Sequence, residues 1–400
     1  MNGLIGTWLS WIGVGFLQFG WLSTLIKLLR GTDRPPQWTL DPETPLDPVP
    51  DGTALSIVVP ARNEARNIER CVRAALAVQW PGPVQVVVVD DRSTDGTGEI
   101  LARLAAADPR LVVVAGADPP PGWLGKPHAL HLAQKAAIGD WLLFIDADVT
   151  IEPRGPHLLV GRTLAQGAVM ASGLGRLEVE TFWERVIQTR IGAVIAGGNP
   201  LEKVNDAENE AALANGQCLL FSRAAYDGLG GHEGIKGSVL DDVDFAKKAK
   251  AEKVPYRLYF SPGVFRCRMY TGFKEIWNGW TKNLFPALSY SLIATVIIVC
   301  LLFAVTVLPF VLVAKNLAVG APYPGYFWVE LSLVATIFLT DALGHRANGY
   351  RWGLFWTFPL GMWVVLALFL NSAWRITSGK GAVWKGRVVE AGRPKPPPKT

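Results

Sequence analysis

Four long hydrophobic segments constrain the fold of this chain more than any other feature. The first, residues 3–26, contains no charged residue and is long enough to cross a bilayer. Three more lie toward the other end, at 286–314, 327–340 and 352–374, and 327–340 is the shortest. Half of the 400 residues are hydrophobic, which is high for a water-soluble protein. We therefore expect a multi-pass protein of the cell membrane, with a water-soluble domain between the first two segments.

Charged residues beside these segments predict their orientation. Lys27, Arg30 and Arg34 follow the first segment, against one acid, Asp33. The segment lacks the basic start of a signal peptide and is too long for a signal-peptide core, so we expect an uncleaved anchor. Because positively charged flanks stay in the cytoplasm, the soluble domain is expected there.

The positive-inside rule conflicts with a topology in which all three C-terminal segments cross the membrane. Three crossings after residue 285 would leave the basic tail outside, whereas His345, Arg346 and Arg351 favour an inside loop. One of the hydrophobic segments is therefore expected to be re-entrant or interfacial. A basic tail beside a membrane favours contact with anionic membrane lipids, and no motif for nucleic acid is present. The basic residues of the tail are Arg375, Lys380, Lys385, Arg387, Arg393, Lys395 and Lys399.

The middle of the chain alternates between two patterns. Short apolar runs at 55–59, 84–89, 111–114 and 141–145 predict strands, and 64–78, 96–107 and 127–138 predict helices. This order predicts an α/β fold with a largely parallel sheet and helices on both faces. A further strand is expected at 217–221 and a helix at 241–253. The expected organisation is a transmembrane anchor (1–30), a Pro-rich linker (31–54), the soluble domain (55–271), an interfacial amphipathic helix (272–285), a transmembrane region (286–374) and the basic tail (375–400).

Two acids, Asp146 and Asp148, directly follow the predicted buried strand at 141–145. Carboxylates at such a position are costly unless a cation or hydrogen-bond donors meet them, although a solvated turn is the simpler alternative. Ligands of open α/β sheets bind at the carboxyl ends of strands. Hard oxygen ligands suit Mg²⁺ or Mn²⁺, so the pair predicts a divalent metal bound with a phosphorylated ligand.

Polar residues follow the other predicted strands as well. Pro60, Ala61 and Glu64 follow the first strand, and Asp91 follows the second. Capping of the next helix by Thr94 or Asp95 is an alternative for the second cluster, but it leaves the acid at the strand end unexplained. Lys126 follows a loop rich in Pro and Gly, where a lysine can neutralise phosphate. Neither a GxGxxG nor a Walker A sequence follows a strand, which disfavours dinucleotide oxidoreductases and P-loop NTPases.

A third acidic group, Asp241, Asp242 and Asp244, begins a predicted helix. Acids favour helix N-termini through the helix dipole, so a purely structural role is an equal alternative. Adjacent carboxylates also repel one another, which raises the pKa of one of them and favours a role as proton acceptor.

Taken together, these motifs resemble those of the family 2 glycosyltransferases with their GT-A nucleotide-sugar-binding fold. The resemblance implies a membrane-bound hexosyltransferase that moves a sugar from a nucleotide-sugar donor, expected to be a UDP-sugar, with inversion and metal assistance. It implies that Asp91 contacts the base or ribose in a pocket lined by Pro60, Ala61 and Glu64, and that Lys126 lies near the nucleotide. Asp148 would be the firmer metal ligand, with Asp146 reaching ribose or metal. Asp242, beside Asp241, would be the general base.

The resemblance extends toward the membrane, where it indicates the acceptor. Arg268-Met269-Tyr270, 279–282 and 384–387 are similar to diaponeurosporenoate glycosyltransferases of carotenoid biosynthesis. The early motifs are also similar to hopanoid-associated glycosyltransferases, and 242–247 to ceramide glucosyltransferases. These relatives imply a lipid or isoprenoid acceptor. Processive family 2 members and ceramide glucosyltransferases carry a Q/R-x-x-R-W element, of which only Trp280 is present here. The missing arginine argues against polymer synthesis and leaves stabilisation of the diphosphate to the metal, Lys126 or Lys282.

Two other functions remain open from the sequence. Paired carboxylates also serve glycoside hydrolases, which need neither a nucleotide pocket nor a metal pair. A catalytically silent membrane scaffold that binds nucleotide sugars is the second alternative. The presence of all three acidic groups favours the transferase.

Overall fold

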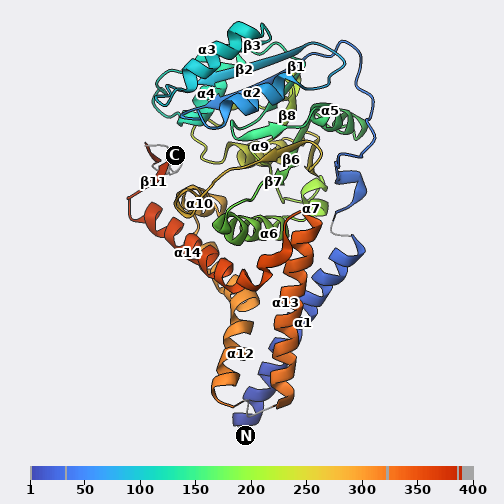
Figure 1. The fold of residues 1–400 in the computed structure, drawn as a ribbon, viewed down its shortest axis with the longest axis vertical. Helices are drawn as coiled ribbons and strands as arrows, with labels where there is room; N and C mark the ends of the chain where they lie inside the picture. The colour runs from blue at the N-terminus through green and yellow to red at the C-terminus, as the bar shows by residue number, and fades with distance from the viewer. Residues whose placement is uncertain (1, 32–33, 321–323, 385–386, 390–400) are drawn as a thin grey trace, which may run out of the picture.

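The computed structural model of the chain describes residues 2–31, 34–320, 324–384 and 387–389. Figure 1 shows a sheet-and-helix domain at one end of the molecule and long helices running away from it, with the N-terminus at their far end. The sheet-and-helix domain and the long helices are therefore separate parts of the fold.

The domain is built on a sheet of seven strands, whose neighbours are fixed by hydrogen-bonded pairing. In spatial order they are β3 (Leu111–Ala115), β2 (Val84–Asp90), β1 (Leu55–Ala61), β4 (Trp141–Phe144), β8 (Leu219–Ser222), β6 (Met170–Leu174) and β9 (Tyr256–Phe260). The strands expected at 55–59, 84–89, 111–114 and 141–145 are confirmed as β1 to β4, with ends shifted by one or two residues.

The direction of the strands is mixed. β1, β2, β3 and β4 are parallel to their neighbours in this group, and β6 is parallel to β9. β8, expected at 217–221, runs antiparallel to both β4 and β6. A largely parallel sheet is therefore correct for the first half only. The sequence pattern cannot reveal the reversal, because a buried strand is apolar in either direction.

Helices cover both faces of the sheet and enclose two apolar cores. On one face α2 (Ile68–Leu76), α3 (Thr97–Ala107) and α5 (Gly155–Ala165) pack on β1, β2 and β4. On the other lie α4 (Gly125–Gln134), α7 (Leu201–Asn205), α8 (Arg223–Gly228) and α9 (Asp241–Ala251). Alternate residues of β1 serve the two cores: Ile57 and Val59 enter the first and Val58 the second. This is the alternation expected of a sheet covered on both faces.

A small second sheet extends the domain toward the membrane side. Its strands are β5 (Val149–Ile151), β10 (Phe265–Cys267) and β7 (Arg176–Leu177). The turn that carries Asp146 and Asp148 joins β4 of the large sheet to β5 of the small one. The acidic pair is therefore held between two sheets.

The remaining helices form the membrane side. They are α1 (Asn2–Arg30), α6 (Thr189–Gly198), α10 (Phe273–Ala287), α11 (Leu292–Leu302), α12 (Leu308–Ala318), α13 (Pro324–Ala347) and α14 (Phe358–Thr377). A π-helical turn at Phe303–Val307 joins α11 to α12, and a hairpin of β11 (Ala382–Trp384) and β12 (Arg387–Val389) follows α14. Among the residues that the structure describes, four helices are long and apolar enough to cross a membrane: Trp11–Arg30, Leu292–Ala318, Gly325–Ala347 and Gly353–Thr377. Each overlaps one of the four segments expected from the sequence.

Helix α13 is longer than its hydrophobic stretch because its polar residues are paired inside the protein. Glu330 is fully buried and accepts a hydrogen bond from Asn316 Nδ2 at 2.5 Å. Asp341 Oδ2 lies 3.0 Å from a guanidinium nitrogen of Arg190 in α6. Carboxylates in an apolar helix are tolerated where such partners replace water.

The Pro-rich segment lies against the domain. Leu40 is completely buried, its N–H donates to Phe260 O at 2.8 Å, and its own carbonyl accepts from Gly263 N at 2.8 Å. Much of the basic tail, including Arg393, Lys395 and Lys399, lies outside the described residues, as does Lys385.

Candidate active site

The carboxyl ends of β1, β2 and β4 meet at one edge of the large sheet. Parallel pairing sets Ala61 beside Asp90, and Asp91 N donates to Ala61 O at 2.7 Å. Ile145, the residue before Asp146, donates its N–H to Val58 O at 3.0 Å. The residues that follow these strands therefore gather at the edge where ligands of open α/β sheets bind.

Lys126, in the first turn of α4, is the centre of a charged cluster. Its Nζ lies 3.0 Å from Asp146 Oδ1 and 3.6 Å from Asp241 Oδ1. Burial by itself lowers the pKa of Lys126, but the carboxylates of Asp146, Asp241 and Asp242 outweigh it, so the net pKa is raised. The lysine is therefore a permanent cation between two acidic loops that are far apart in the sequence.

Asp242 is held in one orientation by backbone donors. Its Oδ2 accepts from Gly216 N at 2.6 Å and its Oδ1 from Val243 N at 2.8 Å. A Cβ at Gly216 would lie 3.1 Å from Lys126 Nζ and 3.3 Å from Asp242 Oδ2, so a side chain there would crowd the pair. Burial and the charge of Asp241 together raise the pKa of Asp242 to about 6. A carboxyl group with this pKa is suited to accept a proton near neutral pH.

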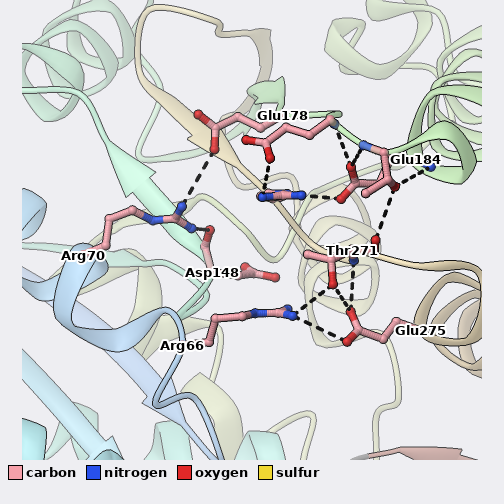
Figure 2. A network of polar contacts seen from close by, with 10 residues as sticks. Arg66, Arg70, Asp148, Glu178, Glu184, Thr271 and Glu275 are labelled. Carbon is pink, nitrogen blue, oxygen red and sulfur yellow. Dashed lines mark hydrogen bonds and ion pairs between the residues drawn. The ribbon is translucent and has the colours of Figure 1, made fainter.

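Asp146 and Asp148 have different surroundings. Asp146 faces Lys126, whereas Figure 2 shows Asp148 between Arg66 and Arg70, which project from α2 and the turn before it. Arg70 also donates to the backbone oxygen of Asp148 at 3.4 Å. Burial raises the pKa of the Cys267 thiol, and the Asp148 carboxylate raises it further, so Asp148 lies close to β10. The structure thus brings Asp146 into direct contact with Lys126, whereas Asp148 lies beside α2 and β10.

Asp146 and Asp148 supply hard oxygen ligands of the kind that a divalent ion requires. Within residues 2–31, 34–320, 324–384 and 387–389, no group of three or more His, Cys, Asp and Glu side chains converges as a metal site. Mg²⁺, however, is commonly held by one or two carboxylates together with phosphate oxygens and water. Asp146 and Asp148 fit that mode of binding and do not form a closed protein cage.

The residues expected to bind the nucleotide lie in two loops that bond to each other. Asn63 N donates to Ser93 Oγ at 2.9 Å, and Asn63 Oδ1 accepts from Thr94 N at 2.8 Å. Asn63 (φ 52°) and Arg92 (φ 57°) both adopt the left-handed region, which is uncommon for residues other than glycine. Backbone strain of this kind often accompanies a functional site.

Asp91, in the second of these loops, is buried and engaged by arginine. Its Oδ1 accepts from Nε and a terminal nitrogen of Arg92 at 2.9 and 2.8 Å. Arg62 donates to the Asp91 backbone oxygen at 2.7 Å.

Glu64 N, in the first loop, donates to Thr97 Oγ1 at 2.8 Å. Pro60 lies nearer the charged cluster, because it lines a narrow cleft together with Lys126 and Asp146.

An ionic network connects the Asp148 loop to the membrane side (Figure 2). Arg70 lies 4.0 Å from Glu178, and Arg66 donates to Thr271 Oγ1 at 3.0 Å. Glu184, which is fully buried, accepts from Arg268 Nε at 3.1 Å. These contacts join α2 to the segments that precede α6 and α10. The acidic turn is therefore positioned from both the soluble domain and the membrane-side helices.

The packing of helix α10 shows why no arginine stands at the fourth position of the Q/R-x-x-R-W element. Gly279 occupies the position of that arginine, and a Cβ there would lie 2.2 Å from Tyr270 Cζ. The phenol ring fills the space that a longer side chain would need. Three residues later, Lys282 is close enough to the charged cluster for the charges there to shift its pKa. Burial and repulsion from Lys126 lower the pKa of Lys282 to about 8, against the opposing effect of the cluster carboxylates.

His232 also lines the narrow cleft, although no motif in the sequence marks it as functional. It is almost fully buried and follows Gly230 and Gly231, both of which have positive φ angles of 72° and 51°. The sequence offered one indication of this role, namely that His232 directly follows two glycines and shortly precedes Asp241. Only the fold shows that this histidine faces the same cleft as Lys126.

A mixed sheet covered by helices on both faces, with acidic loops at the carboxyl ends of its parallel strands, is the GT-A glycosyltransferase fold. Residues 56–230 match the family Glycosyl transferase family 2, so the chain carries a glycosyltransferase domain of that family. The expected fold class and enzyme class are thereby confirmed, together with four apolar helices suited to a membrane.

Curated proteins with similar sequences are also named glycosyltransferases. A 4,4'-diaponeurosporenoate glycosyltransferase of Staphylococcus haemolyticus is 25% identical over 238 residues, covering 58% of this chain and 61% of the relative. Its counterpart in Staphylococcus aureus is 28% identical over 235 residues, covering 58% and 60%. The chain therefore aligns with about six tenths of the length of these relatives.

Solved structures give more distant similarities. A mannosyltransferase of Pyrobaculum calidifontis, in complex with GDP-Man and Mn²⁺, is 20% identical with a TM-score of 0.49. The match covers 92% of this chain and 97% of that one. Glucosyl-3-phosphoglycerate synthase of Mycobacterium tuberculosis, with Mn²⁺ and UDP, is 22% identical with a TM-score of 0.38, over 60% of this chain and 85% of that one.

Proposed function

We propose that the protein is a membrane-bound transferase that moves a sugar from a nucleotide-sugar donor to a lipid or isoprenoid acceptor, with inversion at the anomeric carbon. The observation that carries this proposal is the Asp242 carboxylate, fixed by two backbone N–H donors within reach of the Lys126 cation. A base and a cation for the leaving group are the two groups that a direct displacement requires.

Asp242 takes the proton of the acceptor hydroxyl as its oxygen attacks the anomeric carbon of the donor. The bond from that carbon to the diphosphate breaks on the opposite face, so the configuration inverts. Lys126 offsets the negative charge that develops on the departing diphosphate, and Lys282 adds a second positive charge nearby. Asp241 shares the buried site and keeps the pKa of Asp242 high enough for it to act as a base.

The donor nucleotide is proposed to lie over the two loops at the ends of β1 and β2. Asp91 would accept from the base or ribose, with Pro60, Ala61 and Glu64 as walls of the pocket. We expect a UDP-sugar. In this arrangement the diphosphate points toward Lys126, because the loop of Asp146 follows the neighbouring strand β4.

A divalent ion, Mg²⁺ or Mn²⁺, is proposed to bind with the donor. Asp148 and Asp146 would hold it, and the diphosphate would supply the remaining oxygen ligands. When bound, such an ion neutralises charge on the leaving diphosphate. Lys126 Nζ lies 3.0 Å from Asp146 Oδ1, so its positive charge would act on the same diphosphate as the ion.

The acceptor is proposed to arrive from the membrane along α10. This helix carries Lys282 beside the charged cluster, and its Phe273 and Trp277 rings stack at 5.7 Å. The two curated relatives described above are named 4,4'-diaponeurosporenoate glycosyltransferase. A hydroxyl or carboxylate on a lipid-like chain therefore fits the path better than a water-soluble sugar.

For the topology, we propose three crossings and one surface helix, with the soluble domain in the cytoplasm. Arg34, after α1, donates to Ala347 O at the end of α13 at 3.2 Å, so these two helices end on the same side. In Figure 1, α1, α12 and α13 run along the long axis, whereas α14 runs obliquely against α10. Ser372 in α14 donates to Thr281 O at 2.6 Å. With α14 at the surface, the tail remains inside, as the positive-inside rule requires.

The decisive experiment is transfer by the purified full-length chain in lipid nanodiscs. A panel of labelled nucleotide sugars would be offered with host lipid extract, with Mg²⁺ or Mn²⁺ and with EDTA. We expect one donor to label one lipid class only when metal is present. Binding of a nucleotide sugar with no transfer to any lipid would instead indicate a scaffold. Release of sugar from simple glycosides without metal or nucleotide would indicate a hydrolase.

A further inference from the structure

His232 is a buried polar side chain whose partners are only partly accounted for. Its side chain packs edge-on against the Phe144 ring, with centroids 4.9 Å apart, and its Nδ1 lies 2.6 Å from Tyr226 Oη. The other ring nitrogen, Nε2, is buried and has no hydrogen-bond partner among the described residues. Buried polar atoms in native proteins are nearly always bonded, so an atom of this kind points to a missing partner.

Contacts of Tyr226 assign the proton to Nε2. Tyr226 Oη accepts from the backbone N–H of His232 at 3.1 Å, so its own hydroxyl proton is available for Nδ1. Burial and the charge of Lys126 hold the pKa of His232 well below its usual range, and the ring is therefore neutral. A neutral imidazole that accepts at Nδ1 carries its proton at Nε2. The unpartnered atom is thus an N–H donor.

The cleft beside His232 is continuous with the charged cluster. Lys126, Asp146, Gly216 and Asp241 line it together with the histidine. Its free volume is about 10 Å³, which is close to the space of a single water molecule. A hydroxyl group fits this space, whereas a nucleobase is far larger.

We propose that His232 Nε2–H donates a hydrogen bond to one hydroxyl oxygen of the donor's sugar ring, and so takes part in choosing the sugar. This inference rests on the proposed function, in which Lys126 marks the diphosphate. The sugar is the group attached to that diphosphate, and Lys126 and His232 line the same cleft. Tyr226 positions the imidazole and sets the side on which its proton lies.

Two substitutions separate the two ring nitrogens. In His232→Asn the amide can reach the position of Nδ1, beside Tyr226, but leaves the position of Nε2 empty. In His232→Gln the longer side chain can place an N–H donor near Nε2. The full-length variants would be compared with wild type in detergent by calorimetric titration with UDP-glucose, UDP-N-acetylglucosamine and GDP-mannose, and with UDP and GDP alone.

We expect His232→Asn to bind the accepted nucleotide sugar about tenfold more weakly, while its affinity for the free nucleoside diphosphate stays at the wild-type value. His232→Gln should recover most of the loss. A set of donors that each lack one hydroxyl should include one on which His232→Asn has no further effect, and this identifies the bonded hydroxyl.

Other outcomes are equally informative. Equal weakening of nucleotide sugar and free diphosphate would overturn the inference and leave His232 as a packing residue or the anchor of a buried water. Unchanged affinity in His232→Asn would also overturn it, while leaving the proposed transferase intact. If wild type binds none of the nucleotide sugars, the proposed function itself fails and the inference falls with it.

Discussion

Replacing Asp242 by Asn should separate the chemistry of the site from its stability. The amide keeps an oxygen for the Gly216 N–H donor and nearly the same volume, but it does not accept a proton. Loss of a general base lowers turnover by about 10²- to 10⁴-fold, which corresponds to about 3–5 kcal/mol of activation free energy. Because the nucleotide is proposed to lie over the loops after β1 and β2, affinity for the nucleotide diphosphate should stay within about twofold, a change of only ~0.4 kcal/mol.

The same substitution should not destabilise the fold. Burial and Asp241 raise the pKa of Asp242 from 3.8 to about 6 in the folded protein, so the folded state binds this proton more tightly than the unfolded chain. Stability therefore falls as pH rises between these two values, and at neutral pH the ionised group opposes folding. A shift of about two pKa units corresponds to at most about 3 kcal/mol. In Asp242→Asn the amide oxygen keeps the Gly216 N–H donor, but the amide nitrogen faces the Val243 N–H and loses that hydrogen bond, at a cost of about 1–3 kcal/mol. The two effects offset each other, so the thermal midpoint should stay close to the wild-type value.

Two measurements test this pair of expectations. Initial rates in nanodiscs between pH 5 and 8 should fall for wild type as the pH drops through about 6, because protonated Asp242 is no longer a base. The thermal midpoint in detergent gives the stability. Asp244→Asn is the matched control, since it makes the same change two residues along the helix. Undiminished turnover in Asp242→Asn, or a loss shared by Asp244→Asn, would refute the assignment of the base.

Three further predictions follow from other parts of the fold. Lys126→Met should weaken binding of the nucleotide diphosphate by about 10- to 100-fold in calorimetry, because a charged hydrogen bond to phosphate is lost; unchanged affinity would remove the lysine from the donor site. Gly279→Ala should lower the thermal midpoint through about 1–3 kcal/mol of overpacking against Tyr270, whereas Gly344→Ala, with no atom within 4 Å of its new Cβ, should not. A cysteine introduced as Lys380→Cys should react with an impermeant maleimide in inside-out but not right-side-out vesicles, and the reverse pattern would place α14 across the membrane.

Much of the architecture could be predicted because it depends on local pattern. Four apolar runs, of which all but the short one at 327–340 are long enough to cross a bilayer, predicted the four long helices. β1 to β4 followed from short buried runs bounded by polar residues. Parallel strands end at the same edge of a sheet, so the sequence also predicted that the residues after β1, β2 and β4 would gather there. These inferences need only neighbouring residues and the geometry of a strand or helix.

Other features depend on contacts between distant parts of the chain. The antiparallel direction of β8 depends on how the chain returns to the sheet. The sequence pattern does not show it, because a buried strand is apolar in either direction. The length of α13 depends on Arg190 and Asn316, which pair its acids from other helices. No local pattern distinguishes a paired acid in an apolar helix from an acid that ends the helix.

The charged site shows the same division most clearly. The sequence by itself determined which acids follow the strands and begin α9, and therefore the class of chemistry they favour. Only the tertiary structure decided that Lys126 lies between Asp146 and Asp241, that Asp242 is fixed by Gly216, and that His232 faces the same cleft. The physical reason is that charge and burial act through space. The pKa of a carboxylate and the partner of an imidazole depend on neighbours that the order of residues does not specify.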